Sequence, residues 1–242
     1  MEKKKKISSI LWGVAYFLVG CCILVSSCIL FHNNYYSFIW VDGYSMLPTL
    51  NLNNKTEFGI VDNHKNVMNN IKRFDIVTTY YPIAYNSSNG LISDYSYIDE
   101  EGKEVYTACY DESHDVRVSS TADYKIKRVV ALPGETFKVN QSGVDILNSE
   151  GKWDTYKFNY EHRSGDKTNT EPITLADDEY WVIGDNWGNS IDCKTISSPI
   201  KKENLQGVLI AIEGTCTVKR DKNGEKVIAD KKYYSKFRVF KR

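Results

Sequence analysis

The sequence predicts an all-β domain that follows one N-terminal apolar segment. Aromatic residues make up 13% of the 242 residues, with 17 tyrosines, and β-branched residues are frequent after position 50, a composition that favours strands. No amphipathic helical period in that part is long enough to alternate helices with strands. A chain of this length can bury the core of one sizeable domain with an accessory element.

The N-terminal segment, residues 7–31, holds 25 consecutive positions without a charge. A bilayer core is crossed by about 20 apolar helical residues, so this segment is long enough to span it with some tilt. A cleavable secretory signal has a shorter apolar core of about 7–15 residues. A buried helix of a globular core is rarely apolar on all sides over so many turns. We therefore expect one transmembrane anchor.

The charges around this segment predict its orientation. Four lysines precede it, within residues 1–6, whereas residues 32–41 contain neither lysine nor arginine. By the positive-inside rule, residues 1–6 form a cytoplasmic tail and residues 32–242 lie outside. An aromatic and apolar run suited to the lipid–water interface follows the span: Tyr35, Tyr36, Phe38, Ile39 and Trp40. The expected location is the cell membrane, with a single pass and the bilayer itself as a partner.

Charge and cysteine usage narrow the function classes. Basic and acidic residues balance at 31 each, and the N-terminal lysines leave the rest of the chain mildly acidic. A nucleic-acid partner is not expected, since it would require a basic face on the folded domain. The sequence has no C-x-x-C pair, so neither a metal nor a thiol redox site is expected. Outside the apolar segment we favour small buried thiols over a disulfide, at three positions: Cys109, Cys193 and Cys216.

Three polar segments predict hairpin turns between strand-like runs, namely residues 99–102, 148–151 and 221–224. A longer polar insert, residues 84–123, is rich in Ser, Tyr and Asp and interrupts the apolar pattern. This insert is either an accessory hairpin layer or a mobile loop, and the sequence leaves both interpretations open.

A candidate nucleophile lies just beyond the apolar segment. Ser45 stands between Gly43 and Pro48, two residues that constrain the backbone. A lone serine is usually solvated or bonded to nearby backbone. A nucleophilic hydroxyl needs such a fixed, exposed turn, with a backbone N–H beside it for the oxyanion.

Two further segments carry polar side chains beside apolar strands. Residues 124–135 read as a strand with Lys125 and Lys127 on one face. Taken alone, that pattern is typical of a solvated strand before a Pro-Gly turn. Residues 180–192 run from an apolar strand into an Asp-Asn-x-Gly cluster, which usually builds a loop. Neither segment alone identifies a site.

Together these segments resemble a known family. Three of them, in order, are similar to the signature boxes of type I signal peptidases, the bacterial leader peptidases of Gram-positive-like type: residues 43–50, 127–135 and 184–192. A weaker box fits residues 73–77, with Phe74 where glycine is usual. The resemblance covers residues 1 to about 82 and 124 to about 215. It implies a signal-peptidase/LexA-like β fold outside the membrane and a serine endopeptidase with a Ser/Lys dyad.

The resemblance also implies a role for each matching position. Ser45 would be the nucleophile, and its own N–H would donate to the oxyanion. Gly43 stands where many members carry a second, hydroxyl donor, so that side chain is missing here. Lys127 would be the general base and Ser190 would orient its amine. Three residues would brace the site structurally: Arg128, Asp185 and Asp192.

A lysine base must be neutral, whereas an ordinary lysine pKa is about 10.4. Burial away from a carboxylate lowers it by about 3 units, so we predict a dry pocket around the Lys127 amine. No histidine lies in the boxes, which disfavours a Ser-His-Asp triad. Cys193 and Lys194 replace the family's usual Ser-Arg; a lysine can pair with an acid but lacks the two-pronged geometry of arginine. Phe137 stands where an aliphatic residue is usual.

The implied reaction is cleavage of N-terminal signal peptides from exported preproteins, without metal or cofactor. The precursor would bind extended beside the site, with small residues at −1 and −3. A self-cleaving LexA-like peptidase shares the chemistry, but such proteins are cytosolic and carry a DNA-binding segment that this chain lacks. A non-catalytic accessory factor in surface-protein or pilus assembly is the other alternative, suggested by the departures at Gly43, Phe74, Cys193 and Lys194.

Overall fold

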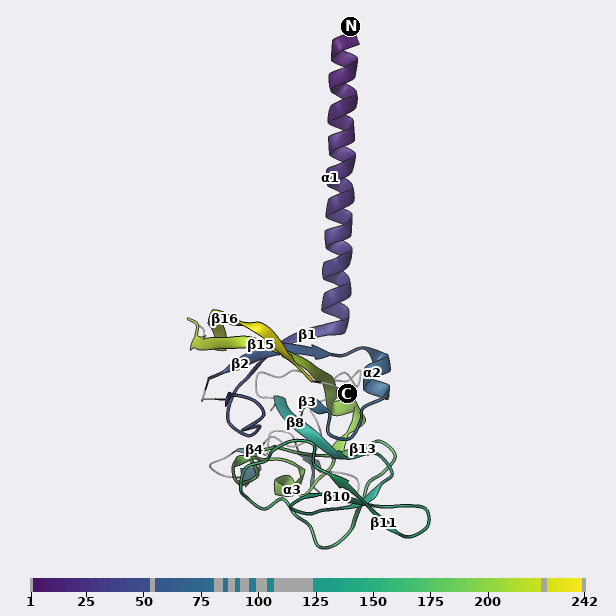
Figure 1. Cartoon of the computed structure of the whole chain (residues 1–242), viewed down its shortest axis with the longest axis vertical. Coiled ribbons are helices and arrows are strands. Elements are labelled where there is room, and N and C mark those ends of the chain that lie inside the picture. Colours follow the sequence, from purple (N-terminus) through teal and green to yellow (C-terminus); the bar gives the residue numbers. More distant parts are fainter. Residues whose placement is uncertain are drawn as a thin grey trace.

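A long helix, α1 (Glu2–Tyr35), projects from one end of a β-rich body (Figure 1). The computed structural model describes the following residues: 2–52, 55–80, 85–86, 90–91, 96–98, 104–106, 124–222 and 226–240. From Trp12 to Val25 the large apolar side chains of α1 are between 52% and 71% exposed. Among the residues that the structure describes, no helix combines the length and the apolar character needed to cross a bilayer. The anchor at residues 7–31 therefore stays a prediction.

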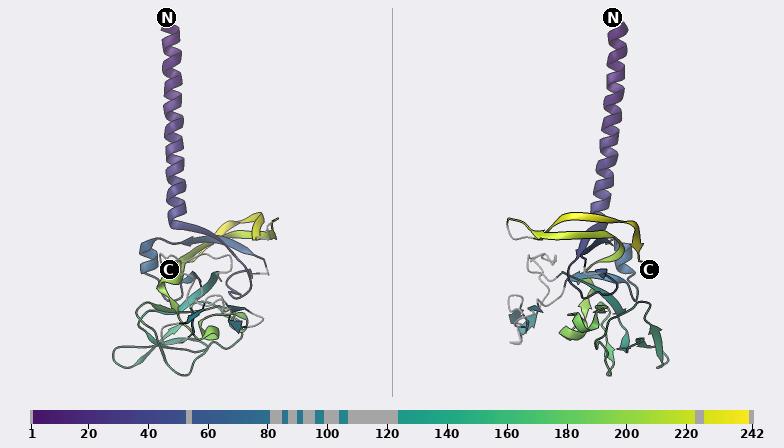
Figure 2. Two further views of the ribbon diagram at one scale, coloured as in Figure 1. Left: turned by 180° about the vertical axis from the view of Figure 1, so that it is seen from behind. Right: turned by 60° about the vertical axis from the view of Figure 1, so that its left-hand side comes forward.

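The body is built on an eight-stranded antiparallel sheet, as the all-β prediction requires. Its strands, in spatial order, are β1 (Tyr36–Val41), β2 (Glu57–Asp62), β15 (Leu205–Arg220), β3 (Ile76–Tyr80), β8 (Tyr124–Ala131), β13 (Glu179–Ile183) and β14 (Ile200–Lys201), with β16 (Lys226–Val239) also paired to β15. The long β15–β16 hairpin lies at the end of the body from which α1 projects (Figures 1 and 2).

A second, four-stranded sheet covers the other end of the body. It has the order β11 (Trp153–Lys157), β10 (Gly143–Leu147), β9 (Thr136–Val139) and β12 (Ile173–Thr174). The other helices in the described part of the chain are short: α2 (Lys65–Asn69), η3 (Trp187–Asn189), α3 (Cys193–Ile196) and η4 (Lys202–Asn204). Two small hairpins fall within the insert: β4 (Tyr85–Asn86) with β5 (Gly90–Leu91), and β6 (Ser96–Ile98) with β7 (Glu104–Tyr106).

All three predicted hairpins are present as antiparallel pairs. They are β6–β7, β10–β11 and β15–β16. Most of the insert at residues 84–123 lies outside the described residues, so the choice between an accessory layer and a mobile loop stays open.

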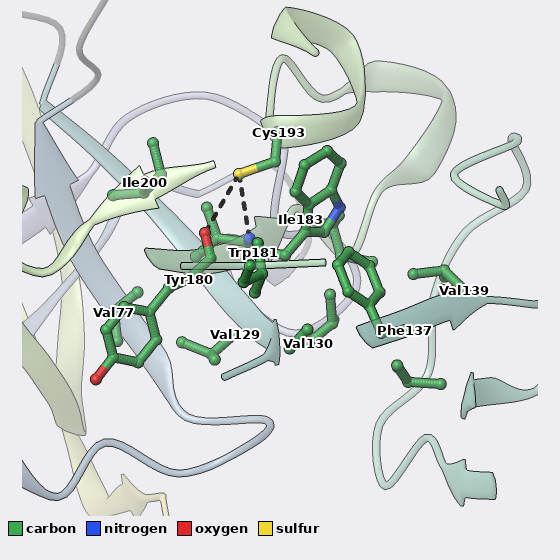
Figure 3. Close-up of a cluster of buried hydrophobic side chains, with 14 of the residues drawn as sticks. Val77, Val129, Val130, Phe137, Val139, Tyr180, Trp181, Ile183, Cys193 and Ile200 are labelled. Atoms are coloured by element: carbon green, nitrogen blue, oxygen red, sulfur yellow. Dashed lines mark hydrogen bonds between the residues drawn. The ribbon is translucent and has the colours of Figure 1, made fainter. Parts of the chain in front are cut away.

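The described residues of the body form two apolar cores. The larger core joins the main sheet to the second sheet, with the Phe137 and Trp181 rings 5.4 Å apart (Figure 3). Cys193 is fully buried in this core, where its Sγ accepts a hydrogen bond of 3.2 Å from Val182 N. Burial raises the pKa of the Cys193 thiol. The prediction of a buried free thiol is thus confirmed for Cys193; Cys216 is also free but only partly buried, and Cys109 lies outside the described residues.

Candidate active site

The loop between β1 and β2 presents Ser45. Two buried side chains on this loop, Met46 and Leu50, belong to the second core and fix it against the main sheet. Asn186 holds the backbone on both sides of the Tyr44–Ser45 peptide. Its N–H donates to Ser45 O at 2.9 Å, and its Nδ2 donates to Tyr44 O at 3.0 Å. The backbone that carries the Ser45 hydroxyl is therefore restrained.

Strand β8 brings Lys127 to this hydroxyl. Lys127 pairs with Val77 in the ladder to β3, and its side chain is only 2% exposed. Lys127 Nζ lies 2.9 Å from Ser45 Oγ and also donates to Ile126 O at 3.0 Å. Two residues 82 positions apart in sequence are thus in hydrogen-bond contact.

Burial is the main influence on the Lys127 amine and lowers its pKa to about 8. The nearby charges of Lys125 and Lys167 lower the pKa of Lys127 as well, whereas Asp192 and Asp185 raise it. A lysine of this pKa is partly neutral near neutral pH, so it can accept a proton from a hydroxyl. The direction of the shift agrees with the predicted dry pocket.

Arg128 and Asp185 form a buried, two-pronged ion pair beside this contact. Arg128 Nε donates to Asp185 Oδ1 at 2.8 Å, and its Nη2 donates to Asp185 Oδ2 at 2.6 Å. The hydroxyl of Thr49 also donates to Asp185 Oδ2, and Arg128 Nη1 donates to Phe74 O at 2.8 Å. The Tyr160 ring lies 3.9 Å from the guanidinium. Such charge-assisted bonds are short and directional, so they tie β8 to the Ser45 loop and to the loop after β13.

Asp192 is held by a cation that the sequence analysis missed. Its Oδ2 accepts a hydrogen bond of 3.0 Å from Gly184 N, and its Oδ1 lies 3.1 Å from Lys167 Nζ, an ion pair without hydrogen-bond geometry. Lys167 Nζ donates instead to Ser190 O at 2.7 Å and to Thr195 Oγ1 at 2.9 Å. Lys194, which stands where the family usually has arginine, is exposed. Because Lys167 lies in a polar segment outside every box, no sequence signal pointed to it.

Ser190 lies next to the site but does not contact Lys127 as predicted. Its Oγ is buried and has no hydrogen-bond partner within the described part of the chain. The hydroxyl packs against Gly184, where an added Cβ would lie 2.2 Å from Ser190 Oγ and 2.5 Å from Ser45 O. The predicted Ser190–Lys127 hydrogen bond is therefore absent from this structure, in which the Ser190 hydroxyl lies against Gly184.

Gly43 and Phe74 both have positive φ. Gly43 has φ 85° and its carbonyl accepts a hydrogen bond of 2.6 Å from Asn51 Nδ2. Phe74 has φ 71°, in the left-handed region where a side chain is strained. This explains why glycine is usual at that position. The Phe74 ring compensates through edge contacts with Phe158 and Tyr160, at centroid distances of 5.9 and 5.8 Å.

Comparison with known proteins shows the family of this chain. Residues 9–212 match the sequence model of the family described as signal peptidase, peptidase S26. A curated relative, Signal peptidase I P of Bacillus subtilis subsp. natto, is 26% identical over 208 residues, which cover 84% of this chain and 88% of the relative. The match includes every site residue described above and ends before strand β16. Among the described residues, no group of three or more His, Cys, Asp or Glu side chains is placed to hold a metal ion.

Proposed function

Because the chain belongs to the signal peptidase family, peptidase S26, we propose that it is a membrane-attached serine endopeptidase that removes N-terminal signal peptides from exported precursors. One observation carries this proposal: the 2.9 Å contact between Lys127 Nζ and Ser45 Oγ in a buried position. Burying a lysine amine is costly. A lysine with no chemical role would therefore be expected to keep its amine in solvent rather than against a serine hydroxyl.

In the proposed reaction, Ser45 Oγ attacks the carbonyl carbon of the scissile bond while neutral Lys127 takes the hydroxyl proton. The tetrahedral intermediate collapses when Lys127 returns that proton to the leaving amine, which is the new N-terminus of the mature protein. A water molecule then attacks the acyl-enzyme and loses a proton to Lys127. Lys127 returns that proton to Ser45 Oγ as the ester bond breaks, and the signal peptide leaves with a free carboxylate. The backbone N–H of Ser45 would donate to the oxyanion, and Gly43 adds no side-chain donor.

The substrate we propose is an extended peptide with small residues at −1 and −3. Strand β1 is an edge strand of the main sheet and leads directly into the Ser45 loop. An edge strand offers unpaired backbone groups to an added peptide strand. This placement supports, for a precursor, binding by strand addition next to Ser45.

Membrane attachment through residues 7–31 is part of the proposal. Helix α1 stands clear of the body (Figures 1 and 2), and its large apolar side chains from Trp12 to Val25 are exposed. Two aromatic side chains of β1, Phe38 and Trp40, are 38% and 37% exposed where the helix meets the body. In a bilayer, those exposed surfaces would be covered by lipid. Protease treatment of intact cells should digest the domain beyond residue 32, and protection of that domain would contradict the proposed orientation.

Cleavage of a purified model precursor in trans tests the activity. We expect the full-length protein in detergent to cleave after the signal peptide, as shown by sequencing the new N-terminus. Ser45→Ala and Lys127→Ala should abolish cleavage with their folds intact by circular dichroism, whereas the exposed control Ser142→Ala should cleave normally. Unchanged processing by both site variants would contradict the proposal, and cleavage of the protein's own chain alone would indicate a self-cleaving peptidase.

A further inference from the structure

The C-terminal strand β16 reaches back to the loop that carries Ser45. We propose that Arg238 and Tyr234, both on this strand, are positioning residues that hold the Ser45 loop in place through the buried carboxylate of Glu57. This inference rests on the proposed function for its kinetic test. It concerns a part of the chain beyond residue 212, where the family match ends.

Glu57 is the centre of this brace. It begins β2 and is only 1% exposed. Its Oε2 accepts hydrogen bonds from Asn51 N at 2.7 Å and from Arg238 Nη2 at 2.6 Å, and its Oε1 accepts one from Tyr234 OH at 2.7 Å. A buried carboxylate is stable only when its oxygens are satisfied in this way. Two of its three donors come from β16.

Asn51 transmits the position of Glu57 to the Ser45 loop. It adopts the left-handed conformation at φ 58°, and its Oδ1 accepts a hydrogen bond of 2.9 Å from Glu57 N. Its Nδ2 donates to Val41 O at 2.8 Å and to Gly43 O at 2.6 Å, which closes the loop on itself around Ser45. The loop that carries the nucleophile is therefore fastened at both ends by one asparagine side chain.

Arg238 also holds this loop directly. Its Nη1 donates to Thr49 O at 2.9 Å while its Nη2 binds Glu57. The Thr49 hydroxyl in turn donates to Asp185. One guanidinium thus joins Thr49, on the Ser45 loop, to Glu57, at the start of β2, and its planar fork makes this two-point contact possible.

The geometry of β16 is adapted to this task. In a regular strand two residues four positions apart are separated by about 13 Å, too far to reach one carboxylate together. Here Ile212 pairs with Arg238 and Gly214 pairs with Tyr233, so that four residues of β16 oppose a single residue of β15. This irregularity lets Tyr234 and Arg238 converge on Glu57.

Burial, followed by the hydrogen bond to Glu57, raises the pKa of Tyr234 to about 12, so the phenol stays protonated as a donor at neutral pH.

The test compares four variants of the full-length protein in detergent on the model precursor, below their unfolding midpoints. Arg238→Met should lower kcat by about 10- to 100-fold with KM within about twofold, because loss of alignment affects the reacting geometry more than substrate binding. Tyr234→Phe should show a smaller fall in kcat. Arg238→Lys should recover part of the loss, because an ammonium can reach one of the two acceptors. The control Lys236→Met, an exposed residue of the same strand, should match wild type.

An unchanged kcat in folded Arg238→Met and Tyr234→Phe, or an equal fall in Lys236→Met, would overturn the brace. If Arg238→Met does not fold, the isosteric Tyr234→Phe decides by the same criterion. If the wild-type protein cleaves no precursor, the proposed function is contradicted but the brace is not. The brace is then tested by amide hydrogen exchange. Faster exchange of residues 41–51 in Tyr234→Phe than in Lys236→Met then supports the brace, and equal exchange overturns it.

Discussion

Lys167 and Asp192 form a buried ion pair, with 3.1 Å between Nζ and Oδ1 and side-chain exposures of 6% and 0%. Their charges act on Lys127 in opposite directions, because Asp192 raises the pKa of Lys127 and Lys167 lowers it. With both charges present, desolvation is left as the dominant influence on Lys127. The pair therefore helps to set the protonation of the proposed base.

Replacing Lys167 by methionine should raise the pKa of Lys127. The change removes a positive charge and leaves Asp192 without its cation, and both effects favour the protonated form of Lys127. The pH midpoint of precursor cleavage should therefore move to higher pH. Removing one partner of a buried pair should also lower the free energy of unfolding by about 3 kcal/mol, measurable by chemical denaturation.

Lys194→Met is the matched control, because Lys194 is exposed. It should change the free energy of unfolding by no more than about 0.5 kcal/mol, and the pH midpoint should stay where it is in the wild type. A shifted midpoint in Lys194→Met together with an unshifted one in Lys167→Met would show that Lys194, not Lys167, compensates Asp192.

Sequence pattern predicted the parts of this protein that depend on local chemistry. A strand-favouring composition and turn residues predicted the β fold and its three hairpins, and the boxes around Ser45 and Lys127 predicted two side chains that lie 2.9 Å apart. The boxes also contain Arg128 and Asp185, the two residues that form the buried ion pair beside the site.

Contacts between segments that lie far apart and outside the signature boxes could not be predicted from the sequence. Lys167 lies in a polar loop, and Arg238 lies in a strand whose sequence carries no motif. Each pairs with an acid distant in sequence, Asp192 and Glu57 respectively, that only the fold brings near. A side-chain hydrogen bond is equally hard to predict, since the Ser190 hydroxyl lies beside the site and has no hydrogen-bond partner among the described residues. Side-chain direction depends on tertiary packing, which a motif does not encode.

The pH dependence of cleavage should follow the titration of Lys127. Burial lowers its pKa to about 8, so kcat/KM should rise with pH to a plateau, with a midpoint near this value in the free enzyme. Below the midpoint each pH unit should cost about tenfold, because only the neutral amine can act as base. A rate profile between pH 6 and pH 10 measures this, and a midpoint near 10 would show that Lys127 is solvated or does not act as the base.

Removing Lys127 should stabilise the protein near neutral pH. Its folded pKa of about 8 lies below the ordinary value of 10.5, so burial of the charged amine costs about 3 kcal/mol below pH 8. Between about pH 8 and pH 10.5 the folded protein binds fewer protons than the unfolded chain, so wild-type stability rises with pH and the cost disappears. Lys127→Met should therefore be more stable than wild type at pH 7, and this advantage should shrink by pH 10. Chemical denaturation at both pH values checks this, and an advantage independent of pH would contradict it.

Phe74 offers a test of backbone strain that reverses the usual order of alanine and glycine. Phe74→Ala and Phe74→Gly both lose the ring contacts to Phe158 and Tyr160, but only alanine keeps a Cβ at φ 71°. The glycine variant should therefore be more stable than the alanine variant by about 1 kcal/mol, as measured by chemical denaturation. At Lys157, an exposed position in β11 with ordinary strand geometry, alanine should instead exceed glycine by about 0.5–1 kcal/mol. The same order at both positions would mean that the left-handed conformation of Phe74 carries no measurable strain.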